Sequence, residues 1–482
     1  METTKQAQSN EVPLTEAAAL ARSPRFVSAR EQLLDVVVAA SLKIEGVRGP
    51  RSEALQVTFQ EQLKRFQKDR GRDLVYPFLA SGIGRGPWVE LLDGSVKYDM
   101  ITGIGISFFG HSHPELMRAA LDATASDIYQ GNLEPGVEVA DLLRALLMRV
   151  ESSSRLRHGW ITTCGTMANE IALKIIRQKK SPATKVIAFR DCFAGRSTAM
   201  QEITDNPKYR EGQPLYGEAA YIPFYMPKLG LQGSLDLTLC ALEDHLQRYP
   251  GKFAALMLEI VQGEGGFNYA PREFYLRVFE VARKAGLAIW ADEIQSFGRT
   301  GELFAFQKFD LGEYVDVVTT AKMLHASAVL FSEEYNPKPG LVAGTFTGTS
   351  ASLRVAKRIL ELLDDGFLGQ KGRVSLLSER FSKNLEKMAT GPHREFISDW
   401  RVIGGMVAVQ PFAGTLDDVK AVLNRLFDLG VVAFQCGHGP MLIRMLPPLG
   451  AMNEGHVDEV CALLGQALQD VAAQRAARNG KS

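Results

Sequence analysis

The most constraining feature of this chain is a long alternation of short apolar runs with helical patterns, between about residues 115 and 350. Apolar runs that alternate with helices are typical of parallel strands whose two faces are both covered. The alternation therefore predicts an α/β fold with a mostly parallel sheet between layers of helices. The clearest runs are Val186–Phe189, Ala254–Glu259, Leu287–Ala291 and Val315–Thr319, and Pro271–Ala285 is a typical intervening helix.

Other patterns precede this alternation. Residues 1–22 are polar and Ala-rich, which predicts an arm or a late-docking helix, and residues 28–72 predict charged helices broken around Gly46–Pro50. Asp93–Gly94 is a turn signal that predicts a hairpin. A loop is expected just before that hairpin, at Gly82, Gly84 and Gly86.

The pattern changes again after about residue 352. A long helix is followed by two short strand runs, Val402–Val409 and Val431–Gln435, on either side of a helix that Thr415 and Asp418 cap, and residues 455–476 predict a closing helix. The tail thus predicts a smaller α+β domain. We divide the chain into an N-terminal helical extension with a small-domain segment (1–90), a large domain (91–355) and a C-terminal small domain (356–482).

Composition narrows the class of partner. The 482 residues are 46% hydrophobic and 23% charged, as in a globular protein with a large core. Lys+Arg and Asp+Glu both number 55, so the formal net charge is 55 − 55 = 0. This balance gives no reason to expect a nucleic acid as partner, and it favours a protein that acts on small molecules.

Targeting and metal signals are lacking. No apolar stretch approaches the roughly 18 residues of a membrane helix, and the N-terminus lacks a secretory pattern. The five cysteines are scattered, odd in number and without CxxC spacing, so neither a disulfide framework nor a metal site is expected. The expected location is the cytoplasm, with no contact with a membrane.

Two apolar runs end in residues suited to chemistry. Asp292 closes the run in LAIWADEIQ, and Lys322 follows the run in DVVTTAK. In open α/β sheets ligands bind at the carboxyl edge of the strands, where a buried carboxylate needs a cation and a desolvated lysine becomes a nucleophile. Taken alone, Asp292 could instead cap the next helix, and Lys322 could extend its amine to solvent.

A third element is a helix start in CGTMANE. Gly165 and Thr166 precede a helix with one apolar face, and the free N–H groups at such a start favour a phosphate, although ordinary caps look the same. No G-x-G-x-x-G follows a strand and no GK[ST] motif is present, which excludes an NAD-dependent dehydrogenase.

The order of these elements and their flanking segments resemble the class III (ornithine-, acetylornithine- and 4-aminobutyrate-type) aminotransferases, which are enzymes of pyridoxal-phosphate (PLP) fold type I. The resemblance covers about residues 91–470. The segments that carry it are GHSHPEL (110–116), CGTMANEIALK (164–174), FAGRST (193–198), EIVQGEGG (259–266), ADEIQSFGRTGELFAF (291–306), DVVTTAK (316–322), GTFTG (344–348) and RMLPPL (444–449).

The resemblance implies a large domain with a seven-stranded type of sheet, a smaller domain, and PLP as cofactor. Lys322 would hold PLP as a Schiff base and shuttle the proton, and Asp292 would pair with the pyridine nitrogen. Gln295 would reach the phenolic oxygen of the ring, and Phe193, whose alternative is a core aromatic, would stack on its face. Gly165 and Thr166 would bind the phosphate.

The resemblance also implies partners. Thr345 would reach the phosphate bound by a neighbouring subunit, so a homodimer is expected. Arg444 would grip a substrate carboxylate, and Glu264 would pair with Arg444 when a distal-amine substrate is bound. The substrates would be an amino acid or ω-amine donor and a keto acid, 2-oxoglutarate or pyruvate. The alternative for Glu264 and Arg444 is an ordinary ion pair at the surface or at a hinge.

The sequence departs from the family around the site. The segment 323–332, MLHASAVLFS, lacks the glycines that usually follow the lysine, which puts the backbone path there in doubt and makes His325 either a replacement loop residue or a new functional group. ADEIQSFGRTG is one residue shorter than usual. Thr347 and Ser350 replace a glycine and a proline, Ala194 replaces a bulkier residue, and the N-terminal 90 residues exceed the usual lead-in.

The function predicted from these residues is PLP-dependent transamination by a ping-pong mechanism. Two alternatives stay open. One is an aminomutase, racemase or decarboxylase on the same scaffold, against which Glu264 and Arg444 argue. The other is a degenerate, non-catalytic aminotransferase-like binding protein, against which Lys322, Asp292, Gln295 and Thr345 argue together.

Overall fold

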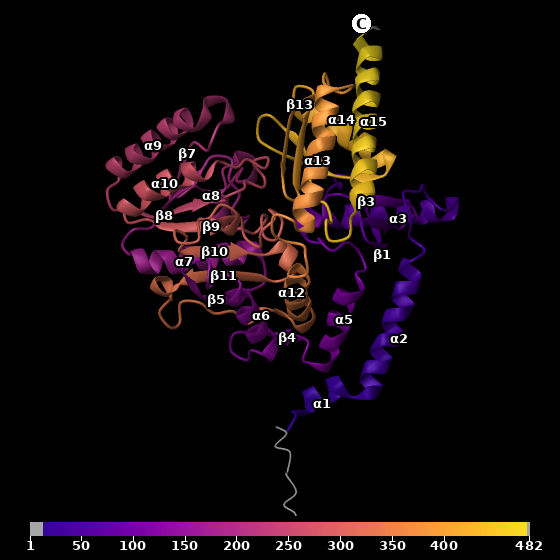
Figure 1. Ribbon diagram of the computed structural model, residues 1–482, viewed down its shortest axis with the longest axis horizontal. Helices are drawn as coiled ribbons and strands as arrows, with labels where there is room; N and C mark the ends of the chain where they lie inside the picture. The colour runs from indigo at the N-terminus through magenta and orange to yellow at the C-terminus, as the bar shows by residue number, and fades with distance from the viewer. Residues whose placement is uncertain (1–12, 480–482) are drawn as a thin grey trace, which may run out of the picture.

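A seven-stranded mixed sheet forms the centre of the computed structural model, which describes residues 13–479 (Figure 1). Its strand order is β5-β11-β10-β9-β8-β6-β7, and β7, β6, β8, β9 and β10 run parallel while β11 runs against both of its neighbours. The predicted mostly parallel α/β sheet is confirmed. The strands are β5 (Leu156–Thr162), β6 (Lys185–Phe189), β7 (Ala219–Ile222), β8 (Phe253–Leu258), β9 (Ala288–Asp292), β10 (Val317–Thr320) and β11 (Ser327–Ser332).

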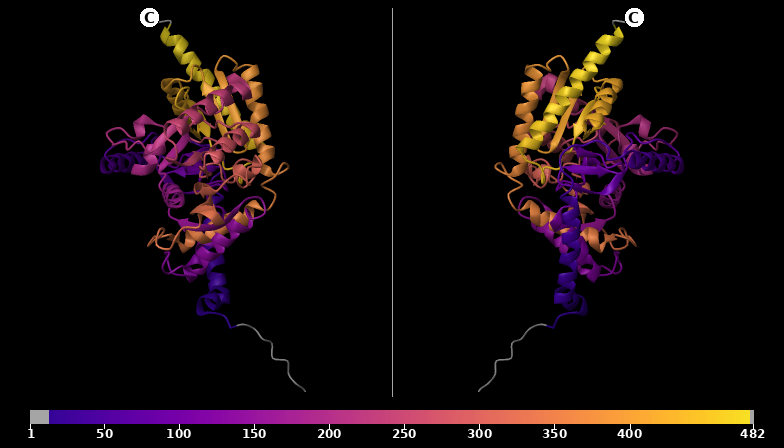
Figure 2. Two further views of the ribbon diagram at one scale, coloured as in Figure 1. Left: turned by 90° about the vertical axis from the view of Figure 1, so that its left-hand side faces the viewer. Right: turned by 90° about the vertical axis from the view of Figure 1, so that its right-hand side faces the viewer.

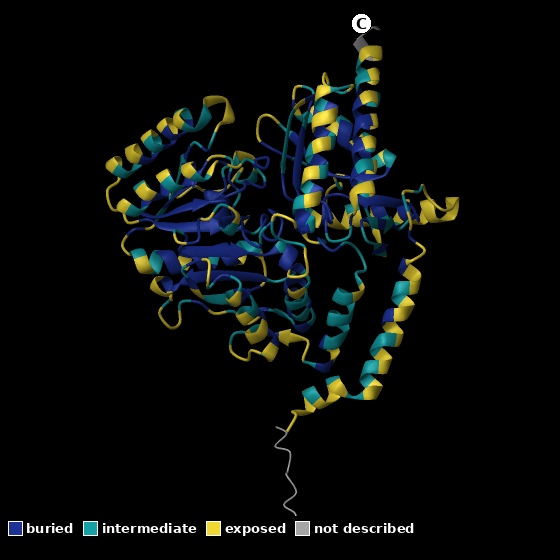
Figure 3. Ribbon diagram, viewed as in Figure 1, coloured by how far each residue is buried: buried dark blue, intermediate teal, exposed yellow. Residues whose placement is uncertain are grey.

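Helices cover both faces of this sheet because alternate strand residues point to opposite sides. On one face Leu256 and Ile289 join a core with α6 (Val137–Met148), α9 (Gly230–Arg248) and α10 (Arg272–Lys284). On the other face Ala255 and Trp290 pack with the apolar side of α7 (Gly165–Lys180). Figure 3 shows the consequence, a dark-blue buried sheet between helices with exposed outer sides.

The C-terminal part forms a second sheet, β13-β14-β17-β16, covered by helices. The prediction of a single strand at Val402–Val409 is wrong. Gly404, with φ +58°, turns the chain there, so the segment forms a hairpin. The run Val431–Gln435 also divides between two sheets, and the strand that carries Arg444 was not predicted. The elements are α13 (Arg373–Thr390), β13 (Ile397–Ile403), β14 (Met406–Pro411), α14 (Leu416–Leu429), β15 (Val431–Val432), β16 (Phe434–Cys436), β17 (Leu442–Met445) and α15 (Glu454–Asn479).

A third sheet joins the lead-in to the C-terminal part. Strands β1 (Ala80–Arg85), β2 (Trp88–Leu91) and β3 (Val96–Asp99) are antiparallel, and β15 pairs with β3 in parallel. The hairpin turn at Asp93–Gly94 is confirmed, but Gly82 and Gly84 lie within β1, where a loop was expected. Residues 80–99 thus share a sheet with residues 431–432, and the division at residues 90 and 355 stays a prediction.

The first helices of the chain lie along the outside of the molecule (Figure 1). Helices α1 (Glu16–Arg22), α2 (Pro24–Ser41) and α3 (Glu53–Arg70) confirm a helical segment broken around Gly46–Pro50, while residues 1–12 of the predicted arm lie outside the described residues. Figure 2 shows α1 and the end of α15 at opposite ends of the molecule. Within residues 13–479 no helix is long and apolar enough to cross a membrane.

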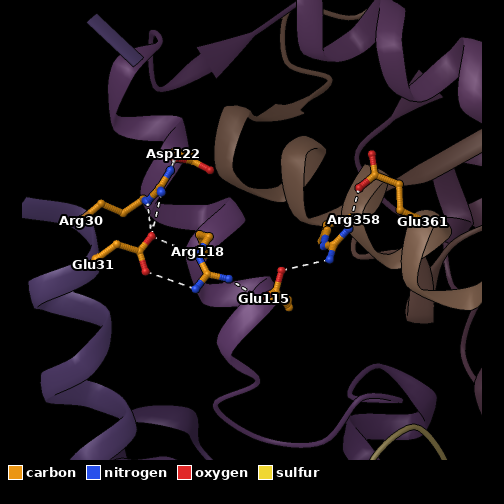
Figure 4. Close-up of polar contacts among 7 residues, drawn as sticks. All are labelled: Arg30, Glu31, Glu115, Arg118, Asp122, Arg358 and Glu361. Carbon is orange, nitrogen blue, oxygen red and sulfur yellow. Dashed lines mark hydrogen bonds and ion pairs between the residues drawn. The ribbon is translucent and has the colours of Figure 1, made fainter. Parts of the chain in front are cut away.

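A chain of charged side chains fixes α2 against α5 (Pro114–Asp122) and α12 (Ser350–Leu363), as Figure 4 shows. Arg30 pairs with Asp122 at 2.5 Å, and Arg118 donates to both oxygens of Glu31 at 3.1 Å. Single exposed pairs contribute about 0–1 kcal/mol. Several of these side chains each contact two partners, and this network, rather than any single pair, orients α2 against α5. The same chain continues through Glu115, Arg358 and Glu361.

Candidate active site

A cavity of about 500 Å³ lies at the carboxyl edge of strands β8, β9 and β10, where ligands bind in parallel α/β sheets. The ends of these three strands supply Glu259, Asp292 and Lys322 to its wall. Most of the residues predicted for the cofactor line this one space, although they come from distant parts of the chain. They are Gly165, Thr166, Phe193, Asp292, Gln295 and Lys322.

Asp292 is buried at the last position of β9 and is held by two hydrogen bonds. Its Oδ1 accepts from the backbone N–H of Ile294 at 2.9 Å, and its Oδ2 accepts from Asn169 Nδ2 at 2.7 Å. Burial raises the pKa of Asp292, whereas these bonds and the nearby Lys322 ammonium lower it. A carboxylate held in this way can stabilise a cationic ring nitrogen.

Lys322 begins a short turn just after β10. Its backbone φ is +50°, a value that residues other than glycine rarely adopt. Burial lowers the pKa of its amine to about 8, although nearby carboxylates oppose the shift. A larger share of the amine is therefore unprotonated near neutral pH, which nucleophilic attack on a carbonyl requires. The strained backbone aims this amine into the cavity.

Asn169 is a buried polar residue that the sequence analysis missed. It lies on the covered face of α7, where its Nδ2 also donates to the Ala194 carbonyl at 2.7 Å and its Oδ1 accepts from Thr319 at 2.7 Å. The only signal in the sequence is an amide on an otherwise apolar helix face. Its partners lie 25 to 150 residues away, so local pattern could not assign its role.

Glu264 and Arg444 form an ion pair at 2.7 Å beside the cavity rather than in its wall. Arg444 is fully buried on β17, and its Nη1 lies 3.4 Å from Gln295 Oε1. Among residues 13–479, no group accepts a hydrogen bond from its Nε or Nη2. A buried guanidinium with free donors is suited to bind a carboxylate.

A cation-and-aromatic wall lies next to this pair, and sequence reasoning also missed it. The guanidinium of the exposed Arg196 lies 3.8 Å from the ring centroid of Tyr209, which meets Phe193 edge-on at 6.0 Å. Burial is the main cause that raises the pKa of Tyr209; the charge of Glu264 also raises it, and Arg196 and Arg444 lower it. Tyr209 therefore lies near the Glu264–Arg444 pair.

Gly165 and Thr166 form the first turn of α7, as predicted. Cys164, the residue that precedes the helix, makes no side-chain hydrogen bond to it, so the first N–H groups stay available to an anion. A Cβ at Gly165 would lie 2.8 Å from the side chain of Ile294. A side chain at this position would therefore require Ile294, in the loop after β9, to shift.

Thr345 is the predicted cofactor residue that does not line the cavity of its own chain. It lies on an exposed loop beside β12 (Gly348–Thr349), which pairs with β4 (Tyr129–Gln130). The apolar side chains around this loop are also exposed, with Leu133 at 91% and Ile128 at 71%. Tyr129, Val137 and Phe346 extend the same exposed surface, which we call the Leu133 patch.

In the turn after Lys322, a histidine adopts the left-handed backbone conformation that usually favours glycine. His325, at φ +57°, lines the cavity near Ile106. Burial lowers its pKa, and a hydrogen bond to the backbone of Ile106 opposes that shift. The chain thus makes the turn without glycine, so the register of Lys322 is kept.

Comparison with known proteins identifies the class. The solved structure of a lysine aminotransferase from M. tuberculosis superposes with a TM-score of 0.76 at 21% identity, over 85% of this chain and 99% of that one. A Bacillus anthracis aminotransferase also gives a TM-score of 0.76, at 19% identity and over 86% and 99% of the two chains. The protein therefore has the PLP fold type I architecture.

The sequence comparisons are more specific. The family described as "Aminotransferase class-III" matches residues 73–468. An acetylornithine aminotransferase of Bacillus subtilis is 30% identical over 403 residues, which cover 80% of this chain and 93% of that protein. A diaminobutyrate–2-oxoglutarate aminotransferase of Rhizobium meliloti is 28% identical over 411 residues, covering 78% and 85%. The chain belongs to the class III aminotransferases, which are PLP-dependent enzymes of transamination.

The cavity fits this cofactor. PLP presents a phosphate, a pyridine nitrogen, a phenolic oxygen and a reactive aldehyde. The cavity wall has a group suited to each of these: the open start of α7, the carboxylate of Asp292, the carboxamide of Gln295 and the amine of Lys322. The described side chains therefore meet the chemical needs of PLP.

Proposed function

We propose that Lys322 is the catalytic lysine of this aminotransferase and that Asp292 holds the pyridine nitrogen of PLP. The observation that carries the proposal is that both side chains enter one cavity from the ends of the adjacent strands β10 and β9. PLP supplies an electron sink for the bonding pair of the substrate carbon. Lys322 Nζ accepts the proton from that carbon and returns it, a task favoured by its pKa of about 8.

The remaining cofactor contacts follow from the lining of the cavity. Phe193 would stack on the ring, Gln295 would donate to its phenolic oxygen, and the N–H groups of Gly165 and Thr166 would hold the phosphate, since all four residues line the cavity. The hydrogen bonds from Asn169 and the N–H of Ile294 favour the ionised form of Asp292, against the effect of burial. These residues bind and orient the cofactor, and Lys322 moves the proton.

For the substrates, we propose an amino acid or ω-amine as donor and a keto acid as acceptor. Arg444 binds the carboxylate beside the reacting carbonyl of a keto acid such as 2-oxoglutarate, while Glu264 neutralises Arg444 when an ω-amine donor, which has no carboxylate at that place, is bound. Arg196 offers a second, exposed cation for the other carboxylate. The relatives are named for acetylornithine, diaminobutyrate and lysine. These names support a donor that has two nitrogen atoms.

We further propose a homodimer built on the Leu133 patch. The patch is apolar and exposed, and Thr345 lies within it rather than beside Lys322 of its own chain. A second copy docked there would bury the apolar side chains and bring Thr345 to the phosphate site of that copy. Exposed apolar patches of this kind are typical of interaction surfaces.

A reducing, cytoplasmic location is the last part of the proposal. All five cysteines are free, and disulfides are rare in proteins of reducing compartments. Fractionation of cells that express the protein, followed by detection with an antibody, tests this location.

The first test is the visible absorption spectrum of the protein with added PLP, beside Lys322→Ala. We expect a band of lysine-bound cofactor in the wild type that the variant lacks, and loss of that band when a true donor is added. A panel of diamines, ω-amino acids and α-amino acids then defines the donor. A wild type without the band in excess PLP would contradict the proposed role of Lys322.

A further inference from the structure

Glu259 is a buried carboxylate of the cavity wall to which no role has been given so far. It follows β8 directly, and each of its oxygens accepts a backbone N–H. Oε1 accepts from Phe193 at 2.8 Å, and Oε2 accepts from Gly263 at 2.8 Å. Phe193 lies 66 residues earlier in the chain, so one side chain joins two segments that local structure does not connect.

The position of Glu259 is electrostatically unfavourable. Burial and the negative charge of Asp292 raise its pKa, and no lysine or arginine of residues 13–479 lies within ion-pair distance of it. Burying a carboxylate without a cation has a large cost in free energy, which hydrogen bonds must offset. The N–H groups of Phe193 and Gly263 supply these hydrogen bonds. The charge of Glu259 is therefore stabilised only when both segments are in place.

Gly263, one of the two residues bound by Glu259, lies next to the Glu264–Arg444 pair. A Cβ at Gly263 would lie 2.5 Å from Gln295 Cδ, so the glycine backbone packs directly on that carboxamide. Gln295 Oε1 in turn lies 3.4 Å from Arg444 Nη1, and the residue after Gly263 is Glu264, the partner of Arg444. The Gly263 turn is thus held between Glu259 and Gln295.

We propose that Glu259 is a positioning residue that sets the spacing between Phe193 and the Glu264–Arg444 pair. The proposal rests on the proposed function, which gives Phe193 a cofactor contact and the pair a substrate contact. With both N–H groups bound to one carboxylate, the cofactor-facing wall and the substrate-binding wall cannot move independently.

Glu293 provides a matched control. It is also fully buried, its two oxygens accept the N–H groups of Phe306 at 2.8 Å and Ala305 at 2.9 Å, and burial raises its pKa to about 7. It does not line the cavity. Glu293→Gln therefore reproduces the loss of a buried clamp without the proposed link to the site. Glu202→Met, which removes the acceptor of the Tyr216 and Glu218 N–H groups, replaces it if Glu293→Gln does not fold.

The first measurement is hydrogen exchange, followed by mass spectrometry, on the protein without cofactor. In Glu259→Gln one oxygen becomes an NH₂ group that faces an N–H donor. We expect exchange in at least one of the two peptides that span Phe193 and Gly263 to rise roughly tenfold or more. In Glu293→Gln the increase should appear around residues 305–306 instead. Unchanged protection of both peptides in Glu259→Gln would overturn the proposal.

The second measurement separates positioning from stability. We expect kcat/KM of Glu259→Gln to fall roughly tenfold or more, mainly through KM for both substrates, at a temperature where the variant is folded. Glu293→Gln should stay within about twofold of the wild type. An equal loss in the two variants would contradict a positioning role.

A further variant and a separate criterion keep the test decisive. If Glu259→Gln does not fold, Glu259→Asp keeps the charge but shortens the side chain by one methylene, so at least one of the two peptides should lose protection. The exchange result does not depend on catalysis. Failure of the proposed function would appear as a missing visible band in the wild type, whereas failure of this inference would appear as retained protection.

Discussion

Asn169 Nδ2 lies 2.7 Å from Asp292 Oδ2, and the same nitrogen lies 2.7 Å from the carbonyl oxygen of Ala194. One buried amide thereby joins the carboxylate proposed to hold the pyridine nitrogen to the loop that carries Phe193. Its Oδ1 accepts from Thr319 on β10, so the amide cannot turn without losing a bond. The orientation of Asp292 is therefore set by a residue of α7.

Replacing Asn169 by Ala is expected to weaken cofactor binding. A hydrogen bond to a charged group contributes about 1.5–3 kcal/mol, so PLP affinity should fall roughly tenfold to a hundredfold. Titration of the visible band with PLP measures the effect. Thr319→Val removes a bond to Asn169 but leaves the bond to Asp292, and its effect should be smaller. An Asn169→Ala protein with wild-type PLP affinity would show that Asp292 orients itself.

The depressed pKa of Lys322 makes stability depend on pH. Its pKa is about 8 in the folded protein against 10.5 when unperturbed, so below about pH 8 the folded state bears the full cost of a buried ammonium. That cost declines as pH rises from 8 to 10.5. In the protein without cofactor, Lys322→Met should be more stable than the wild type by a few kcal/mol at pH 7, and the difference should shrink towards pH 10.5. Urea unfolding at several pH values measures it, and a difference independent of pH would contradict the shift.

Arg444 is expected to discriminate between keto acids and ω-amine donors. Lysine cannot reproduce a bidentate guanidinium contact, so Arg444→Lys should raise KM for 2-oxoglutarate and for pyruvate roughly tenfold or more, because both have a carboxylate beside the reacting carbonyl. KM for an ω-amine donor should change less, because that donor has no carboxylate beside its reacting carbon. Steady-state kinetics with both acceptors and the donor provides the comparison. Arg299 is also buried but bonds the Pro447 carbonyl, so Arg299→Lys serves as the control for loss of a buried guanidinium. Equal effects of Arg444→Lys on KM for the acceptors and for the donor would place the carboxylate elsewhere.

The parts of the molecule that were predictable from sequence are those set by local pattern. The apolar runs that end at Asp292 and precede Lys322 are strands β9 and β10, because a run of that length can be buried on both faces only inside a sheet. Thr415 and Asp418 form the capping box expected of them, since that contact spans three residues. The cofactor and family came from the order of motifs, which is a resemblance rather than a physical derivation.

The parts that were missed depend on distant contacts. Asn169 and Glu259 are buried polar residues whose partners are assembled only by the fold, so nothing within a window of the sequence indicates them. The turn at Gly404 was missed because apolar residues on both sides suggested one strand. A Cβ at this position would lie 1.8 Å from the Arg299 carbonyl oxygen, a constraint that only the tertiary structure reveals.

Mixed dimers test whether Thr345 acts across the subunit boundary. Consider a hybrid of one Lys322→Ala chain and one Thr345→Ala chain. If each Thr345 serves the other subunit, both substitutions affect the site of the Lys322→Ala chain, and the second site keeps wild-type Lys322 and Thr345. If Thr345 serves its own chain, each site carries one defect.

The two arrangements differ in a measurable way. Tagging the two chains differently allows the hybrid to be purified, and PLP titration of its visible band reports affinity at the site that retains Lys322. We expect wild-type affinity there, against roughly tenfold weaker binding in the Thr345→Ala homodimer, which lacks one hydrogen bond to a charged phosphate. Weak binding in the hybrid would place Thr345 with its own Lys322, contrary to its exposed position on the Leu133 patch.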